Sequence, residues 1–125
     1  MHQQDRRQRR SVDPLIALHY QLAHARTNGA LEAIVVADAS GVVVAGAGSW
    51  AACEELAAYA PLLARGGAVV TAEASRVEVL RGQTAVASVE VEDQEVHICA
   101  RGGVGRAQTV EAAASGVARI LKAAA

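Results

Sequence analysis

Two adjacent apolar runs constrain the fold of this chain more than any other feature of its sequence. Leu31–Ala37 and Val42–Ala47 are rich in β-branched residues, and the turn sequence DASG joins them, which is typical of a β-hairpin. Both runs are apolar at alternate and at intervening positions, a pattern expected of strands that are covered on both faces. Helices must therefore lie on both sides of a sheet, which predicts an α/β (α+β) fold.

Helices are predicted before this hairpin and at the C-terminus. The first covers about residues 14–27, with Asp13 as its cap, and the Asn-Gly pair at 28–29 should end it. The last follows Gly105 and runs to the C-terminus, with apolar and charged residues on opposite sides.

A further helix is predicted over residues 50–64, after the capping residue Ser49, and it is apolar on most of its circumference. Pro61 should kink or break it. A single domain offers only one sheet face to such a helix, so a second copy of the chain is expected to cover the remainder. The residues assigned to this dimer interface are Cys53, Leu56, Tyr59, Ala60 and Leu63.

Three more strands are predicted as an antiparallel meander, over Arg76–Arg81, Thr84–Val91 and Glu95–Arg101. Residues 68–74 fit a loop, a helical turn or a strand equally well. The prediction is a five-stranded antiparallel sheet between helices, in the order α-β-β-α-β-β-β-α. An edge strand containing Val77 and Val79 would leave backbone groups unpaired, so these two residues are also assigned to the dimer interface.

The length of 125 residues fits one domain, assigned to residues 13–125. Just over half of the residues are apolar, but there is no Phe, one Trp and two Tyr, which argues against a stacking platform for nucleic acid. Residues 1–12 are read as a disordered basic leader, either simply solvated or in contact with an anionic partner. No apolar run approaches the roughly 20 residues of a membrane span, and a twin-arginine export signal is rejected, so a cytoplasmic location is expected.

The sequence offers no convincing catalytic or metal site. Cys53 and Cys99 lack CxxC spacing and are expected to be free, buried thiols. His97 and Cys99 share one strand face, so a thiolate–imidazole pair is conceivable, but core packing is the simpler interpretation. His19 and His24 are off a common helical face, which disfavours a metal. The chain is therefore predicted to be no enzyme and to hold no cofactor or metal.

Three residues are candidate contacts for a protein partner. Trp50 is the only tryptophan and could anchor a partner, although packing at the rim of the domain is the alternative. Arg76 and Arg81 could face an acidic partner, although solvated charge is the simpler explanation.

Several stretches resemble the roadblock (dynein light chain) family, which includes bacterial regulators of small Ras-like GTPases. The hairpin ALEAIVVADASGVVVAGAG, the helix EELAAYAPLL and the meander VEVLRGQTAVASVEVEDQEVHICARGG carry the resemblance, which covers residues 14–124. It implies a roadblock/profilin-like fold and a homodimer formed by the second helices and the first meander strands. It also implies a non-catalytic adaptor whose partner is a small Ras-like GTPase. The alternative is a small-molecule sensor of the GAF or profilin-like type.

Overall fold

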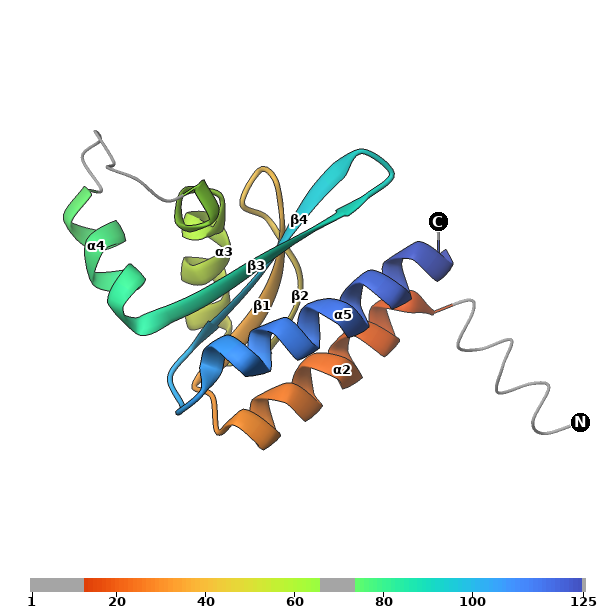
Figure 1. Ribbon diagram of the computed structural model, residues 1–125, viewed down its shortest axis with the longest axis horizontal. Helices are drawn as coiled ribbons and strands as arrows, with labels where there is room; N and C mark the ends of the chain where they lie inside the picture. The colour runs from red at the N-terminus through yellow and green to blue at the C-terminus, as the bar shows by residue number, and fades with distance from the viewer. Residues whose placement is uncertain (1–12, 66–73, 125) are drawn as a thin grey trace, which may run out of the picture.

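A four-stranded antiparallel sheet lies between two pairs of helices in the computed structural model, which describes residues 13–65 and 74–124 (Figure 1). The basic leader and most of the ambiguous stretch at 68–74 lie outside these residues. The strands are arranged in the order β2-β1-β4-β3. In chain order the elements are α2 (Pro14–Gly29), β1 (Ala33–Asp38), β2 (Val43–Gly48), α3 (Trp50–Arg65), α4 (Ala74–Gln83), β3 (Thr84–Val91), β4 (Gln94–Arg101) and α5 (Arg106–Ala124).

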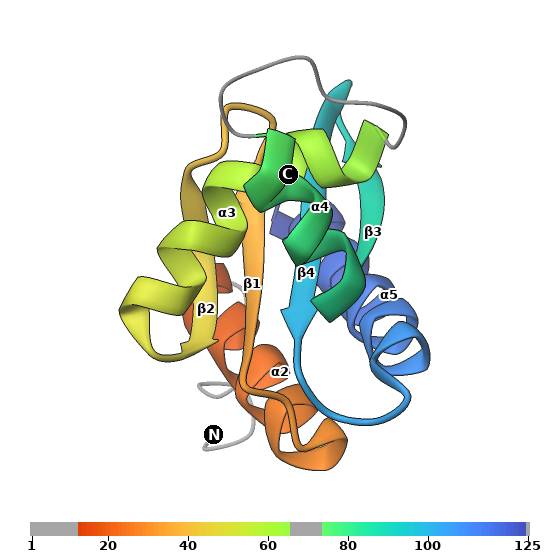
Figure 2. The same cartoon turned by 90° about the vertical axis from the view of Figure 1, so that its left-hand side faces the viewer.

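The helices divide between the two faces of the sheet, as the doubly apolar hairpin required. Figure 2 shows α3 and α4 in front of the strands and α2 and α5 behind them. Alternate residues of β1 enter two separate apolar clusters, Ile34 with α2 and α5, and Val35 with α3 and α4. The α2–α5 cluster contains Leu18, Leu22, Ile34, Val36, Ile98, Ala100, Val110, Ala113 and Val117, and the α3–α4 cluster contains Ala33, Val35, Cys53, Leu56, Ala60, Leu63, Val77, Leu80 and Cys99.

The predicted hairpin is confirmed, and its turn contacts α3. Asp38 Oδ1 accepts hydrogen bonds from the backbone N–H of Ser40 at 2.8 Å and of Val42 at 3.0 Å, which is how a short Asp side chain fixes a turn. Gly41 has φ +84°, and a Cβ at this position would lie 3.2 Å from the Ala57 carbonyl oxygen. The turn needs glycine both for its backbone conformation and for its approach to the helix.

Helix α3 begins where the sequence predicted. The Ala52 N–H donates to Ser49 Oγ at 3.2 Å, so Ser49 caps the helix as expected. Pro61 lies inside the helix and does not end it, because α3 continues to Arg65.

Helix α2 starts where the sequence predicted, but both of its ends are capped differently from the prediction. It begins at Pro14, but the side chain of Asp13 makes no capping hydrogen bond. The left-handed residue at its end is Ala30, with φ 49°, instead of either residue of the Asn-Gly pair. The backbone N–H of Ala30 bonds to Thr27 O and that of Leu31 to Arg26 O, which satisfies the last carbonyl groups of the helix.

The predicted strand at residues 76–81 is wrong, since this segment lies in helix α4. The described sheet therefore has four strands and not five. Val77 and Leu80 are both fully buried, whereas Val79 is 48% exposed. A spacing of three places Val77 and Leu80 on one helical face, and this burial outweighs the β preference of the alternating valines.

The final hairpin and helix follow the prediction closely. Strands β3 and β4 pair from Thr84–Arg101 to Val91–Gln94. The two residues of the connecting turn, Glu92 and Asp93, both have positive φ (50° and 65°), as a two-residue turn matching the twist of the strands requires. Within the described residues, none of the helices is both long enough and apolar enough to cross a bilayer.

Candidate functional site

Helix α3 turns one side toward its own sheet, and that side holds most of the predicted dimer interface. Cys53, Leu56, Ala60 and Leu63 are at most 6% exposed and pack into the α3–α4 cluster. Their side chains are covered by strands and by α4 of the same chain, so they offer a partner no surface in this conformation. Only Tyr59 among the predicted α3 residues is partly exposed.

The opposite side of α3 carries three apolar residues in line with the charged Glu55. Ala51 and Ala58 are exposed and Leu62 is partly buried. Spacings of seven and four place them along one side of the helix, and we call them the outer stripe of α3. Sequence reasoning detected that the helix is apolar on most of its circumference, but the interface residues it chose lie mainly on the side that faces the sheet. The sequence alone could not tell which apolar residues of α3 face the strands and which face outward.

Trp50 stands at the start of α3 and is 62% exposed. This large aromatic side chain is therefore available at the surface, as a partner anchor requires. Its role in binding stays a prediction.

Arg76 and Arg81, the other predicted partner contacts, are both engaged within the chain. Arg76 forms a two-pronged ion pair with Glu55 of α3, with Nη2–Oε1 2.6 Å and Nε–Oε2 3.0 Å. Arg81 Nη1 donates to Glu78 Oε1 at 3.0 Å, one helical turn away. Neither side chain is simply solvated, and Arg76 links α4 to α3.

A charged network extends the Arg76–Glu55 pair across this layer. Arg101, at the end of β4, donates to Glu55 Oε1 at 2.9 Å and to both carboxylate oxygens of Glu32 at 2.9 and 3.1 Å. The hydrogen bonds from Arg76 first, and then the one from Arg101, lower the pKa of Glu55. The carboxylate of Glu32 raises the pKa of Arg101. The network of Glu32, Glu55, Arg76 and Arg101 thus stays charged and joins α3, α4 and the sheet.

Val77 and Val79 do not form the edge strand expected of them, because both belong to α4. The sheet instead ends at β3, and within the described residues no strand pairs with its outer edge. Such an edge presents backbone N–H and C=O groups that another chain can pair with. The predicted edge strand is therefore wrong, and the edge of the described sheet is β3 instead.

The thiols are buried and free, as predicted. Burial raises the pKa of Cys99 to about 12 and also raises the pKa of Cys53. The thiolate–imidazole pair is not formed, because His97 Nδ1 is paired instead with Ser88 Oγ at 2.8 Å. His97 Nε2 lies 3.3 Å from Glu95 Oε1. This places the buried histidine in a polar contact between β3 and β4.

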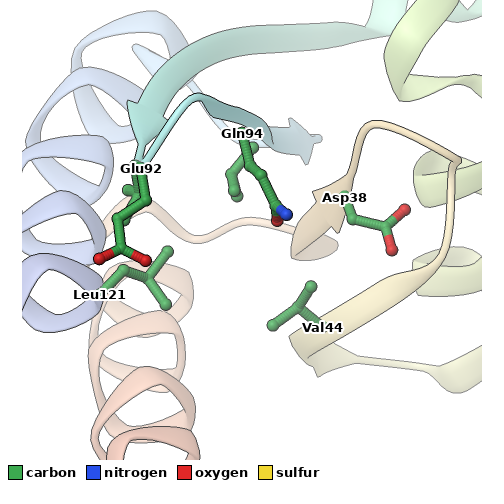
Figure 3. Close-up of a pocket in the computed structure, with 7 residues that line it drawn as sticks. Asp38, Val44, Glu92, Gln94 and Leu121 are labelled. Atoms are coloured by element: carbon green, nitrogen blue, oxygen red, sulfur yellow. The ribbon is translucent and has the colours of Figure 1, made fainter. Parts of the chain in front are cut away.

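Among residues 13–65 and 74–124, no three His, Cys, Asp or Glu side chains are grouped so that they could hold a metal ion. A surface hollow of about 380 Å³ lies at one end of the sheet, and Asp38, Gln94 and Leu121 are among the residues that line it. Figure 3 shows how these three side chains lie. Val44, Val91, Glu92 and Val96 complete the lining of the hollow. The alternative prediction, a small-molecule sensor, would have to use a hollow of this kind.

Comparisons with known proteins identify the fold. No family model matches the sequence, and no curated protein matches it. Three solved structures of MglB match the chain with TM-scores of 0.56–0.59. The chain therefore has a roadblock-like fold, which confirms the resemblance seen in the sequence at the level of the fold.

The three structures differ little in how they match. MglB from Myxococcus xanthus is 11% identical, and the match covers 89% of this chain and 92% of that one, with a TM-score of 0.58. A structure described as MglB with a tetrameric arrangement is 15% identical, over 90% and 93%, with a TM-score of 0.59. The gliding protein MglB from Thermus thermophilus is 17% identical, over 87% and 91%, with a TM-score of 0.56.

Proposed function

We propose that this chain is a homodimeric, non-catalytic adaptor of the roadblock type that binds a small Ras-like GTPase in the cytoplasm. The observation that carries the proposal is the match to MglB over about nine-tenths of both chains. The partner class comes from the roadblock resemblance. The role is regulation or scaffolding through the surface that two copies create.

Two features, one on α3 and one at the edge of the sheet, support the dimer. Ala51 and Ala58 of the outer stripe are small, which would allow a second helix to approach α3 closely beside Glu55, and Leu62 adds apolar area. The outer edge of β3 offers a row of backbone groups that a symmetric partner would satisfy. One of the matching MglB structures shows a tetrameric arrangement, so copies of this fold do assemble.

The dimer is tested by measuring particle mass with light scattering over a range of concentrations. We expect twice the chain mass of 12.9 kDa. Ala58→Asp places a charge on the outer stripe and should yield single chains, whereas Ala112→Asp, at an exposed alanine of α5 in the opposite layer, should leave the dimer intact. A wild-type particle of single-chain mass at high concentration contradicts the dimer.

The GTPase partner is tested with small GTPases encoded beside this chain's gene. Immobilised protein should retain one of them in a nucleotide-dependent way, and Trp50→Ala should weaken retention without changing particle mass. Nucleotide turnover by the retained GTPase then separates a regulator, which changes the rate, from a scaffold, which does not. If no candidate GTPase is retained, the partner assignment is wrong while the dimer can still stand.

A further inference from the structure

Among residues 13–65 and 74–124, His97 is the one polar or charged residue that is buried. It is 2% exposed and lies on β4, two positions before Cys99, so its side chain points to the α3–α4 face of the sheet. The imidazole takes no part in the proposed dimer or GTPase contacts. Both of its ring nitrogens have a polar neighbour, and the two neighbours differ in kind.

The neighbour of the first nitrogen is Ser88, on the outer strand of the sheet. Ser88 and His97 are directly opposite each other in the register of β3 and β4, and Ser88 Oγ lies 2.8 Å from His97 Nδ1. The serine is exposed, whereas the ring behind it is buried. The hydroxyl group of Ser88 therefore stands between Nδ1 and the solvent.

Carboxylates lie near the second nitrogen. Glu95 Oε1 is 3.3 Å from His97 Nε2, and Glu90 is directly opposite Glu95 in the register. An ionised carboxylate can only accept hydrogen bonds, so Glu95 favours the tautomer that carries its proton on Nε2. Nδ1 is then the acceptor, and the hydroxyl of Ser88 donates to it. An exposed nucleophile, a buried base and a carboxylate that orients the base are the three parts that activate a serine.

We propose that Ser88 is a nucleophilic serine that takes up an acyl group from an activated ester or thioester, with His97 as its base. Ser88 Oγ attacks the carbonyl carbon while its proton passes to Nδ1 of His97. The bond from the carbonyl carbon to the leaving oxygen or sulfur then breaks, which leaves an ester on Ser88. Glu95 stabilises the imidazolium, and the proton on Nε2 passes to this exposed carboxylate and on to water. The products are the serine ester, the anion of the leaving group and one proton.

The acyl group should remain on Ser88, because hydrolysis of the ester needs a base that water can reach. His97 is only 2% exposed, and the esterified serine would still cover Nδ1. Ser88 is thus a site of covalent modification, which agrees with a non-catalytic adaptor. The reaction uses side chains on one face of β3, whereas strand pairing in a dimer uses backbone groups at its edge. The two proposals can therefore fail separately.

The test is the reaction of the full-length chain with p-nitrophenyl acetate. We expect a burst of about one equivalent of p-nitrophenolate per chain without continued turnover, and peptide mass spectrometry should place the acetyl group on Ser88. Ser88→Ala should abolish the burst. Ser115→Ala, at an exposed serine of α5 whose Oγ lies 3.4 Å from the Glu111 carbonyl oxygen, is the matched control and should react as the wild type does.

Substitutions of the base and of the carboxylate test whether the serine is activated and not merely exposed. His97→Gln should slow the acetylation about a hundredfold or more. Glu95→Gln should slow it less, by about tenfold, because water screens the exposed carboxylate. Nitrogen-15 NMR of the imidazole gives a reading that a purely structural role of Glu95 would not change. The wild-type ring should carry its proton on Nε2, and Glu95→Gln should lower the fraction of this tautomer.

Three outcomes would overturn the proposal. They are acetylation of other groups without acetylation of Ser88, a burst that survives Ser88→Ala, and an unchanged rate in both His97→Gln and Glu95→Gln. Continued turnover after the burst would overturn the assignment as a modification site in favour of a hydrolase. If circular dichroism shows that His97→Gln does not fold, the Ser88 and Glu95 variants still decide, because both side chains are exposed.

Discussion

Helices α2 and α5 cover one face of the sheet with 16 and 19 continuous residues, whereas α3 shares the other face with α4, which has only ten. The α2–α5 pair is in direct contact along its length and buries mostly aliphatic side chains. Helix α4 contributes two fully buried side chains, Val77 and Leu80, and is otherwise joined to α3 by the ion pair of Arg76 with Glu55. In the first layer both helices are long and packed against each other, whereas in the second only the short helix α4, among the described residues, buries few side chains.

The largest effect should come from the α2–α5 pair. Leu22→Ala removes a fully buried side chain of α2 and should lower the free energy of unfolding by about 2–5 kcal/mol. Urea denaturation measures this loss. Leu15→Ala, at a half-exposed position of the same helix, is the control and should change stability by no more than about 0.5 kcal/mol.

The equally buried Leu80 of α4 sharpens the comparison. Leu80→Ala should cost less than Leu22→Ala, because α4 can detach while the remaining structure stays folded. Hydrogen exchange should then show faster exchange in α4 and at the start of β3, to which α4 is directly joined. An equal loss of unfolding free energy for both leucine substitutions, with hydrogen exchange rising throughout the chain, would mean that the two layers are equally stable.

A smaller effect is expected where α3 approaches β2. A Cβ at Gly46 would lie 2.9 Å from Cys53 Sγ, so Gly46→Ala should destabilise the fold by about 1–3 kcal/mol. At Gly82 of α4 a Cβ meets nothing within 4 Å, and Gly82→Ala should stabilise by about 0.5–1 kcal/mol. The midpoint temperatures of thermal unfolding of the two variants should therefore shift in opposite directions relative to the wild type. A shift of the same sign in both would contradict the packing described for α3.

The charged network predicts a modest dependence on pH. The arginine contacts lower the pKa of Glu55, so its carboxylate stabilises the fold above its ordinary pKa, and this contribution is lost as the pH falls through the lowered value. Glu55→Gln should remove about 1 kcal/mol or less at neutral pH, because solvent screens the pair. Urea midpoints measured down to about pH 3 should also fall less steeply in this variant. The exposed neighbour provides the control, and Glu54→Gln should behave as the wild type does.

The least perturbing experiment changes no residue. It measures local unfolding of the α3–α4 layer by the chemical labelling of the two buried thiols, Cys53 and Cys99. Because burial raises the pKa of Cys99 to about 12 and raises that of Cys53, neither should react with iodoacetamide at about pH 8 while the chain is folded. Mass spectrometry should show full labelling in denaturant. Labelling of Cys53 or Cys99 under native conditions would show that this face opens far more often than its packing suggests.

Sequence reasoning succeeded where one pattern had one structural solution. The hairpin of β1 and β2, the cap at Ser49 and the strand at β4 all followed from the sequence, and each is confirmed. The sequence could not assign residues 76–81, because RVEVLR alternates like a strand yet also places Val77 and Leu80 at helical spacing. Tertiary burial decides between these patterns, and a single sequence does not contain that information.

The candidate dimer interface could be predicted from the sequence only in part. The sequence indicated that α3 carries apolar residues on most of its circumference, but it did not show which of them face the sheet, and Leu56 and Leu63 were assigned to the interface. In the fold these large side chains meet the sheet, and small residues such as Ala58 lie outside. The pairing of Arg76 with Glu55, 21 positions away, had no local signal at all.

Helix α4 ends at Gln83 and β3 begins at Thr84, so no loop residue separates the helix from the strand. Thr84 Oγ donates to the carbonyl oxygen of Leu80 at 2.7 Å and fastens this junction. A molecule that binds the outer edge of β3 would consequently displace α4 as well. Detachment of α4 would in turn disturb the first residue pair between β3 and β4. A displacement of the β3 edge and a displacement of α4 would thus be coupled.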